Sequence, residues 1–128
     1  MLNGTIPPAI GKVENLHKLD LGHNSLGGSI PSTIGELTLM DYLDLHDNML
    51  GGSIPTEVGR LTHLRFVRLK ENELTGTLPS EIGNLSDLVS FNINNNKIFG
   101  TVPSTFSNLK SIGTRCLLSL RFVVSPSK

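Results

Sequence analysis

Side chains suited to molecular recognition recur along this 128-residue chain at intervals of 24 residues. Tyrosine, phenylalanine and arginine often anchor binding interfaces, and they stand at Tyr42, Phe66 and Arg68. Charged and amide residues occupy the equivalent positions nearby. The candidate ligand-binding residues are Lys18, Asp20, His23, Tyr42, Asp44, His46, Asp47, Phe66, Arg68, Lys70, Glu71, Asn92, Asn94 and Asn95. These residue types indicate non-covalent recognition.

No arrangement in the sequence predicts catalysis. No serine is placed with a histidine and an acid as in a catalytic triad, and no glycine-rich phosphate loop continues into Lys-Ser or Lys-Thr. His17 and His63 occupy different repeat positions from His23 and His46, whereas tetrahedral zinc needs three or four convergent ligands. We therefore expect no metal, no cofactor and no enzymatic activity.

One pair of carboxylates, Asp20 and Asp44, stands a repeat apart and would lie side by side as like charges. Arg68, at the next equivalent position, could relieve their repulsion from one side. Two carboxylates alone make a weak calcium site. We interpret the three residues as surface electrostatics.

The 24-residue interval belongs to a repeat that runs through the chain without insertion or deletion. Such a repeat predicts a solenoid in which each coil packs only on its neighbours. The recurring prolines are Pro7, Pro31, Pro55, Pro79 and Pro103. The recurring asparagines, which we interpret as a structural ladder, are Asn24, Asn48, Asn72 and Asn96.

Apolar residues keep the same register and predict a parallel sheet. Each coil contains Leu-x-x-Leu-x-Leu or a close variant, whose final alternation marks a short strand with one buried face. Side chains beside the buried positions then form rows across the coils, on a surface that we call the concave face. The rows are Lys18/Tyr42/Phe66/Ser90, Asp20/Asp44/Arg68/Asn92, Gly22/His46/Lys70/Asn94 and His23/Asp47/Glu71/Asn95.

The segment after each strand predicts a turn and a short convex helix. A carboxamide both donates and accepts hydrogen bonds, so stacked asparagines can satisfy the backbone groups of the turns. The glycines and proline of Gly27–Pro31 should form and end a short extended stretch. The segment 32–37 is too short for a full helix and favours a helical or 3₁₀ turn.

The consensus Leu-x-x-Leu-x-Leu-x-x-Asn-x-Leu-x-Gly-x-Ile-Pro-x-x-Ile-Gly-x-Leu resembles the plant-specific class of leucine-rich repeats over residues 2–112. The resemblance implies an α/β solenoid: a right-handed superhelix with a concave parallel β-sheet, short 3₁₀ or helical turns on the convex side, and further short strands on one flank. Similar coils occur in ectodomains of receptor-like kinases and receptor-like proteins, in polygalacturonase-inhibitor-like proteins and in some algal proteins. The resemblance also implies an extracellular or cell-surface location.

We expect one leucine-rich-repeat domain over residues 1–112, with a half coil at 2–15 and full coils starting near 16, 40, 64 and 88. The register fails afterwards, because Arg115 replaces an expected leucine. Residues 113–128 are either a degenerate last coil that uses Cys116 or a non-native tail. No capping cysteines flank the repeats, so Ile6, Ile10 and Val13 should lie on an open end. The chain is then a fragment of a longer protein, or it pairs with another molecule at this open end.

Composition excludes several partners. Eleven basic and eleven acidic residues balance, which argues against nucleic acid. The tail's apolar run is interrupted by Arg121 and is too short to insert into a membrane, and the N-terminus lacks a secretory signal pattern.

Asn3 and Asn84 begin possible glycosylation motifs. Small hydroxyls recur at Thr5, Ser29, Ser53, Thr77 and Thr101, which predicts an exposed row that suits strand pairing or, alternatively, ice or glycan binding.

Two functions remain open from the sequence. The first is a non-enzymatic protein- or peptide-recognition module of a receptor-like or secreted protein, with a receptor-like kinase ectodomain as one possible parent. The second is a structural scaffold that self-associates end to end. Five short strands would make a sheet about 20 Å tall. A stable interface buries about 800 Å² per partner, so we expect this concave face to be part of a longer surface.

Overall fold

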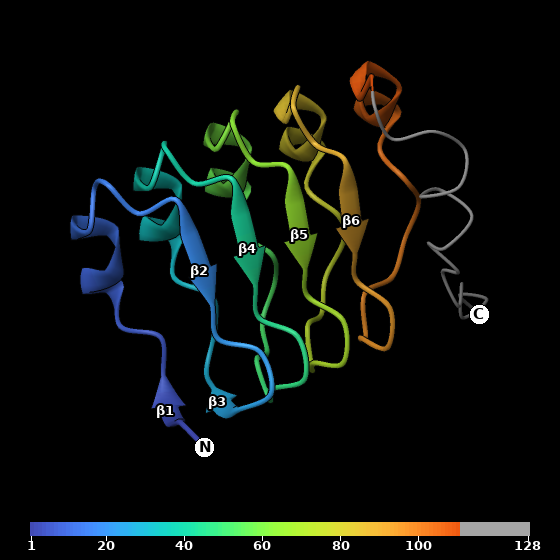
Figure 1. Ribbon diagram of the computed structural model, residues 1–128. Coiled ribbons are helices and arrows are strands. Elements are labelled where there is room, and N and C mark those ends of the chain that lie inside the picture. Colours follow the sequence, from blue (N-terminus) through green and yellow to red (C-terminus); the bar gives the residue numbers. More distant parts are fainter. Residues whose placement is uncertain (111–128) are drawn as a thin grey trace, which may run out of the picture.

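The computed structural model describes residues 1–110, which form a stack of coils joined by one parallel sheet (Figure 1). The sheet contains β2 (Lys18–Asp20), β4 (Tyr42–Asp44), β5 (Phe66–Arg68) and β6 (Ser90–Asn92), in chain order. Neighbouring strands pair residues 24 apart, as the sequence predicts. The fifth strand assumed for the area estimate lies outside the described residues.

A 3₁₀ helix follows the recurring proline of every coil. These helices are η1 (Pro8–Lys12), η2 (Ser32–Glu36), η3 (Thr56–Arg60), η4 (Ser80–Asn84) and η5 (Ser104–Asn108). Figure 1 shows them gathered along one side of the stack, away from the strands. Glycine permits their close packing, because a Cβ added to Gly59 would lie 2.6 Å from the carbonyl oxygen of Glu81 in the next coil. The turns expected as helical or 3₁₀ are thus 3₁₀.

A second and smaller sheet lies on one flank of the stack. It pairs β1 (Asn3–Thr5) with β3 (Ser25–Gly27) in parallel, and bridges at Ser29–Gly51 and Ser53–Thr75 continue the pairing. Gly28 and Gly52 have φ of +71° and +69°, a conformation that glycine adopts without steric cost. The predicted solenoid class, including strands on a flank, is confirmed.

The core is an aliphatic ladder between the main sheet and the 3₁₀ helices. Met40, Leu64 and Leu88 succeed one another along it, and each is fully buried. Phe91 and Phe106 meet edge to face at a centroid distance of 6.3 Å in the last described coil. Large aliphatic side chains in unbroken rows explain how a chain with few aromatics builds a continuous core.

The N-terminal half coil is less open than the sequence suggests. Val13 is 48% exposed and Ile10 is partly buried, as expected for an end, but Ile6 is only 4% exposed. The prediction for Ile6 is wrong because its side chain packs within the core cluster. At the other end, Arg115, Cys116 and the whole proposed tail 113–128 lie outside the described residues.

The asparagine ladder joins successive coils through backbone groups. The side-chain Oδ1 of Asn72 accepts from the backbone N–H of Leu50 at 3.0 Å, and its Nδ2 donates to the carbonyls of Leu45 and Leu69 at 2.9 and 3.2 Å. Leu45 and Leu50 belong to the preceding coil. The asparagines one coil earlier and one coil later make equivalent bonds. The predicted satisfaction of turn backbone groups is confirmed.

Replacing Asn72 by leucine should lower the free energy of unfolding by about 2–3 kcal/mol, since the buried N–H of Leu50 loses its acceptor and the carbonyls of Leu45 and Leu69 each lose one of two amide donors. Asn24 is the matched control, because the Leu2 N–H that it accepts is exposed and its Nδ2 donates only within its own coil, to Leu21 and Gly22. Asn24→Leu should therefore cost less than half as much. Urea unfolding of both variants measures the difference, and equal losses would contradict this account of the ladder.

Candidate ligand-binding site

The centre of the concave face is a cluster of aromatic and cationic side chains. Tyr42 on β4 and Phe66 on β5 have ring centroids 6.2 Å apart. Lys18 Nζ lies 4.6 Å from the Tyr42 ring, and the guanidinium of Arg68 lies 5.7 Å from the same ring. Strand pairing explains the cluster, because residues 24 apart are brought side by side. Its members are predicted candidates for ligand binding.

Arg65 also belongs to this cluster, although it is not among the binding residues predicted from the sequence. Its guanidinium lies 5.4 Å from the ring of Phe66. The residue precedes β5 by one position, so it was not assigned to an outward row of the strand. Its position directly before an outward-facing aromatic residue is the sequence feature that could have identified it.

Asp44 departs most from the prediction, because it lies at a buried position of the concave face. It is only 2% exposed. Its carboxylate accepts hydrogen bonds from the Tyr42 hydroxyl at 3.0 Å and from the backbone N–H and ring Nδ1 of His46 at 3.1 and 2.5 Å. Arg68 Nη1 lies 3.5 Å away. These neighbours cover the carboxylate, so the expectation of a solvent-facing Asp44 is wrong, whereas the expected proximity of Arg68 is confirmed.

The surroundings of Asp44 shift the pKa of two groups. Burial acts to raise the pKa of the Asp44 carboxyl, but hydrogen bonds from the His46 ring and backbone and from Tyr42 outweigh it and leave this pKa below its usual value. Burial and the hydrogen bond to the Asp44 carboxylate raise the pKa of Tyr42. Asp44 is therefore ionised at neutral pH and holds Tyr42 and His46 in place.

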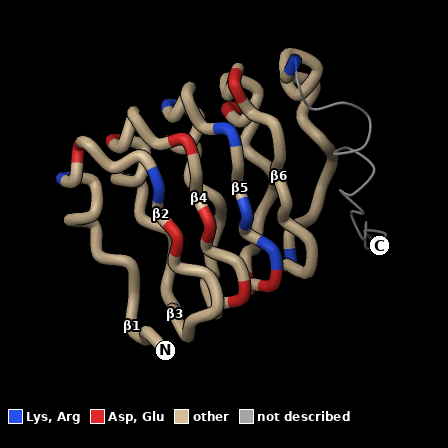
Figure 2. The backbone as a smooth tube through the Cα atoms, viewed as in Figure 1, with Lys and Arg blue, Asp and Glu red and all other residues tan. Residues whose placement is uncertain are grey.

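Charge is distributed unevenly across the concave face. Figure 2 shows basic residues following one another along β5 and just beyond it, where Arg65, Arg68 and Lys70 stand. Asp20 and Asp44 occupy the equivalent positions to Arg68 on β2 and β4. The next strand, β6, has no charged residue. Arg65, Arg68 and Lys70, which we call the basic strip, thus lie beside four uncharged residues of the next coil: Ser90, Asn92, Asn94 and Asn95.

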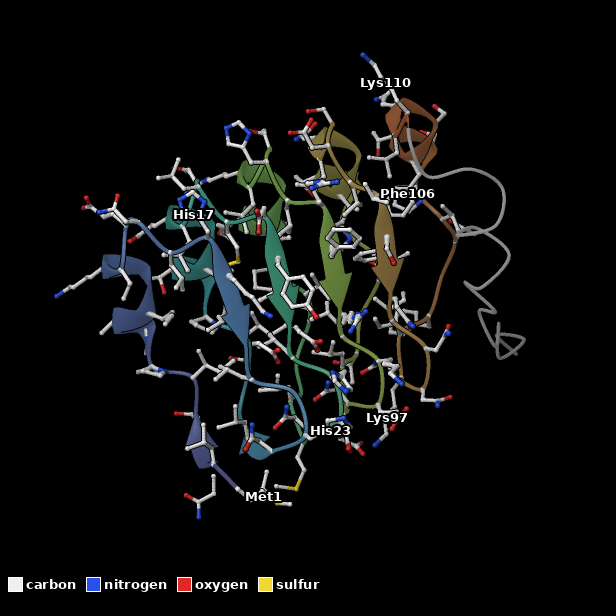
Figure 3. The ribbon with its side chains drawn as sticks, viewed as in Figure 1. Met1, His17, His23, Lys97, Phe106 and Lys110 are labelled. Atoms are coloured by element: carbon white, nitrogen blue, oxygen red, sulfur yellow. The ribbon has the colours of Figure 1, made fainter. Side chains whose placement is uncertain are left out.

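The fourth predicted row lies in the turns beyond the strands. His23, Asp47, Glu71 and Asn95 all have left-handed φ values, between 54° and 57°. Non-glycine residues seldom adopt this conformation, and asparagine and aspartate tolerate it best. The row therefore marks a sharp backbone turn. It carries side chains to the rim of the concave face, as Figure 3 shows for His23.

Other predicted sites are placed as follows. Asn3 in β1 and Asn84 at the end of η4 are both exposed, and so are the five hydroxyl residues of the flank row. Within residues 1–110, no group of three or more histidine, cysteine, aspartate or glutamate side chains is placed to hold a metal ion. No helix among these residues is long and apolar enough to cross a bilayer.

Asp44→Asn should lower the free energy of unfolding at pH 7 by about 1–2 kcal/mol, because the buried amide loses charge-assisted hydrogen bonds. The folded-state pKa of Asp44 is depressed, so its contribution is present above the unfolded pKa of about 3.9 and is lost as pH falls through the folded value. The difference between the native chain and the variant should thus shrink below about pH 4. Thermal unfolding of the native chain and the variant at several pH values measures this difference in stability, and Asp20→Asn, at an exposed carboxylate, is the control. A difference that does not change with pH would contradict the prediction.

Comparison with known proteins places this geometry in a family. A sequence model of the leucine-rich repeat matches residues 15–37, 40–61, 63–85 and 87–109. A search of curated proteins finds no match to the chain. Solved structures, by contrast, match over most of its length.

Three similar structures come from plants. The ectodomain of the receptor kinase GASSHO1/SCHENGEN3 from Arabidopsis thaliana, in complex with CASPARIAN STRIP INTEGRITY FACTOR 2, is 38% identical with a TM-score of 0.84, over 85% of this chain and 13% of that one. The plant peptide hormone receptor RGFR1, in complex with RGF2, is 34% identical with a TM-score of 0.85, over 86% and 18%. A plant ice-binding protein is 31% identical with a TM-score of 0.80, over 84% and 35%.

The chain therefore spans less than a fifth of the two receptors and about a third of the ice-binding protein. Both the repeat matches and the structural matches cover the coils described above. The chain belongs to the leucine-rich repeat family, and its coils are of the plant type found in receptor-kinase ectodomains.

Proposed function

We propose that this chain is a protein- or peptide-recognition segment of an extracellular leucine-rich-repeat protein, and that it binds its ligand non-covalently on the concave face. The observation that carries the proposal is the cluster of Tyr42 and Phe66 with Lys18, Arg65 and Arg68. Aromatic rings and arginines supply large contact areas and directional bonds, as in the centres of binding interfaces. The complex of the similar plant peptide hormone receptor RGFR1 with RGF2 supports the same use of the fold.

The charge pattern suggests the chemistry of the ligand. Arg68 and Lys70 of the basic strip already lie 3.5 Å from Asp44 and 3.2 Å from Glu71, so Arg65 is the member that would attract an anionic group. The planar guanidinium of arginine pairs with a carboxylate in bidentate geometry. An apolar side chain beside that group would lie against Tyr42 and Phe66. The amides of β6 and the turn after it offer donors and acceptors to a peptide backbone. A short peptide with an acidic residue next to an apolar one fits these requirements.

The size of the face sets a limit on affinity. Four strands about 4.8 Å apart span only about 15 Å, with roughly 10 Å along each strand. Such an area is well below the roughly 800 Å² per partner of a stable protein complex. We propose that these coils contribute part of the surface of a longer ectodomain. Asn84 on the convex side is then the favoured glycan acceptor, because a glycan there leaves the concave face free.

Selection from a random heptapeptide library tests the proposed surface. Enriched peptides should carry an acidic and an apolar residue, and Tyr42→Ala or Arg68→Ala should weaken their binding about tenfold or more, since each removes an anchor. Arg60→Ala on η3 is the control, as it removes an exposed arginine from the convex side. Peptides that bind all variants equally would refute the assignment. Concentration-dependent oligomers in size-exclusion runs would favour the rival function, end-to-end self-association.

Ice binding is a second candidate because the five flank hydroxyls are exposed and a plant ice-binding protein has a similar fold. The row is one residue wide and mixes serine with threonine, which disfavours a regular ice-matching surface. We therefore expect ice recrystallisation in the presence of the chain to be unchanged by Thr77→Leu with Thr101→Leu. A loss of inhibition in that double variant would establish the hydroxyl row as an ice site.

A further inference from the structure

Two histidines face each other at the junction of the first and second coils. His23 lies in the turn after β2, and His46 lies at the position just before the equivalent turn after β4. Their Nε2 atoms are 2.9 Å apart, and the rings meet edge to face at a centroid distance of 4.2 Å. This contact is not part of the aromatic and cationic cluster proposed for ligand binding.

Each of these rings is held at its other nitrogen by a carboxylate. His46 Nδ1 lies 2.5 Å from Asp44 Oδ1, and His23 Nδ1 lies 2.7 Å from Asp47 Oδ2. A hydrogen on each Nδ1 satisfies these two contacts. Both Nε2 atoms of neutral rings would then present lone pairs to each other, because a neutral imidazole has one donor and one acceptor.

The three contacts require three protons, whereas two neutral imidazoles supply two. Ionised carboxylates supply none, and Asp44 is held in its ionised form by its hydrogen bonds. One ring of the pair must therefore be an imidazolium for all three contacts to be hydrogen bonds. The alternative tautomers only move the missing hydrogen to one of the carboxylate contacts.

We propose that His23 and His46 share one additional proton between the carboxylates of Asp44 and Asp47, and that this proton fastens the first coil to the second. The pair is a proton-binding site with one buried and one exposed member: the side chain of His46 is 13% exposed and that of His23 is 73% exposed. When the proton leaves, two lone pairs face each other, and His23 is the ring that is free to turn away.

The local fold is adapted to this contact. The ring of His46 lies over Gly22, where an added Cβ would be 2.6 Å from ring atoms of His46. Gly22 is not among the glycines with positive φ, so the small size of this residue, rather than backbone freedom, makes room for the ring. The equivalent positions on the third and fourth coils hold Lys70 with Glu71 and Asn94 with Asn95, which cannot make a histidine pair. The pair of His23 and His46 with their carboxylate partners, which we call the clasp, therefore occurs once among the described coils.

The surrounding charges favour retention of the proton. Asp44 and Asp47 contact the rings directly, and Asp20 accepts a hydrogen bond from the backbone of Gly22 beneath His46. Tyr42, on the same strand as Asp44, is neutral near pH 7, since its pKa is raised still further above its ordinary value of 10.0. Two cations lie against these carboxylates: Arg68 pairs with Asp44 at 3.5 Å, and Lys18 pairs with Asp20 at 3.7 Å. On the adjacent coil, Lys70 pairs with Glu71 at 3.2 Å. Three carboxylates and two cations thus surround the histidine pair, and the remaining negative charge favours one added proton.

The direction of the pH effect follows from this count. When the junction opens, both histidines become free imidazoles that are each half protonated near pH 6.5, so together they carry about one proton there. Above about pH 6.5 the closed junction, which keeps one proton, binds more protons than the open junction and therefore loses stability as pH rises. Both contacts of His23 cross from the first coil to the second, so the effect should be local to this junction. Backbone bonds that report on it are His23 N–H to the His46 carbonyl, 3.0 Å, and Asn24 N–H to the Asp47 carbonyl, 3.1 Å.

Amide hydrogen exchange of the 128-residue chain tests the proposal, with a metal chelator present so that no metal replaces the proton. After correction for intrinsic rates, protection of the His23 and Asn24 amides should fall about tenfold between about pH 6.5 and pH 8. The internal control is the same pair of bonds one coil later, from the amides of Asp47 and Asn48 to Lys70 and Glu71. Their protection should not change.

Two variants complete the test. Asp47→Asn removes one carboxylate while keeping a residue type that already occupies this turn conformation at Asn95, and it should abolish most of the pH-dependent change. His17→Ala removes an exposed histidine outside the clasp and should leave the change intact. The proposal fails if both junctions respond to pH alike, if neither responds, or if His17→Ala abolishes the response. Ring ¹⁵N spectra of the native chain give a second readout: near pH 6 both Nδ1 atoms should carry hydrogen and the Nε2 atoms should share one.

Discussion

Every coil of this protein depends on hydrogen bonds that only its neighbour can complete. The asparagine after each full strand accepts an N–H from the previous coil, and its amide donates to carbonyls of its own coil and, from Asn48 onward, of the coil before. A turn without these bonds would leave backbone groups unpaired beside an apolar core, at a cost of about 1–3 kcal/mol for each. The coils are therefore held at one register, and the strands, 3₁₀ helices and aliphatic rows follow it.

The same register creates the concave face. Residues 24 apart become lateral neighbours, so Lys18, Tyr42 and Phe66 form one continuous row although they are distant in sequence. Substitutions in such a row change the surface without disturbing the ladder beneath it. Outward-facing side chains and buried core side chains therefore alternate along the same short strands. The basic strip beside an uncharged strand is the feature that distinguishes this surface chemically (Figure 2).

At the ends of the strands, some residues of the outward-facing rows also contribute to the stability of the fold. Asp44 is drawn inward by Tyr42, His46 and Arg68, so a residue at a recognition position serves to organise its neighbours. His46 in turn reaches His23 across the coil junction. The outer surface of the first two full coils is therefore a connected polar network, which Arg68 of the third coil also joins through Asp44.

The repeat, its register, the buried rows, the asparagine ladder and the outward-facing rows can all be predicted from the amino-acid sequence. These follow from periodicity, because identical spacing in a stacked fold permits one arrangement of neighbours. The sequence by itself could not determine that Asp44 is buried, that Arg65 joins the aromatic rings, that Ile6 is covered, or that His23 and His46 meet. Those outcomes depend on side-chain direction and on contacts between different rows, which a one-dimensional register does not specify. They are set by three-dimensional packing: Ile6 lies within the core cluster, hydrogen bonds from Tyr42 and His46 cover Asp44, and the histidines meet because the His46 ring fits against Gly22 and a left-handed turn carries His23 to the rim.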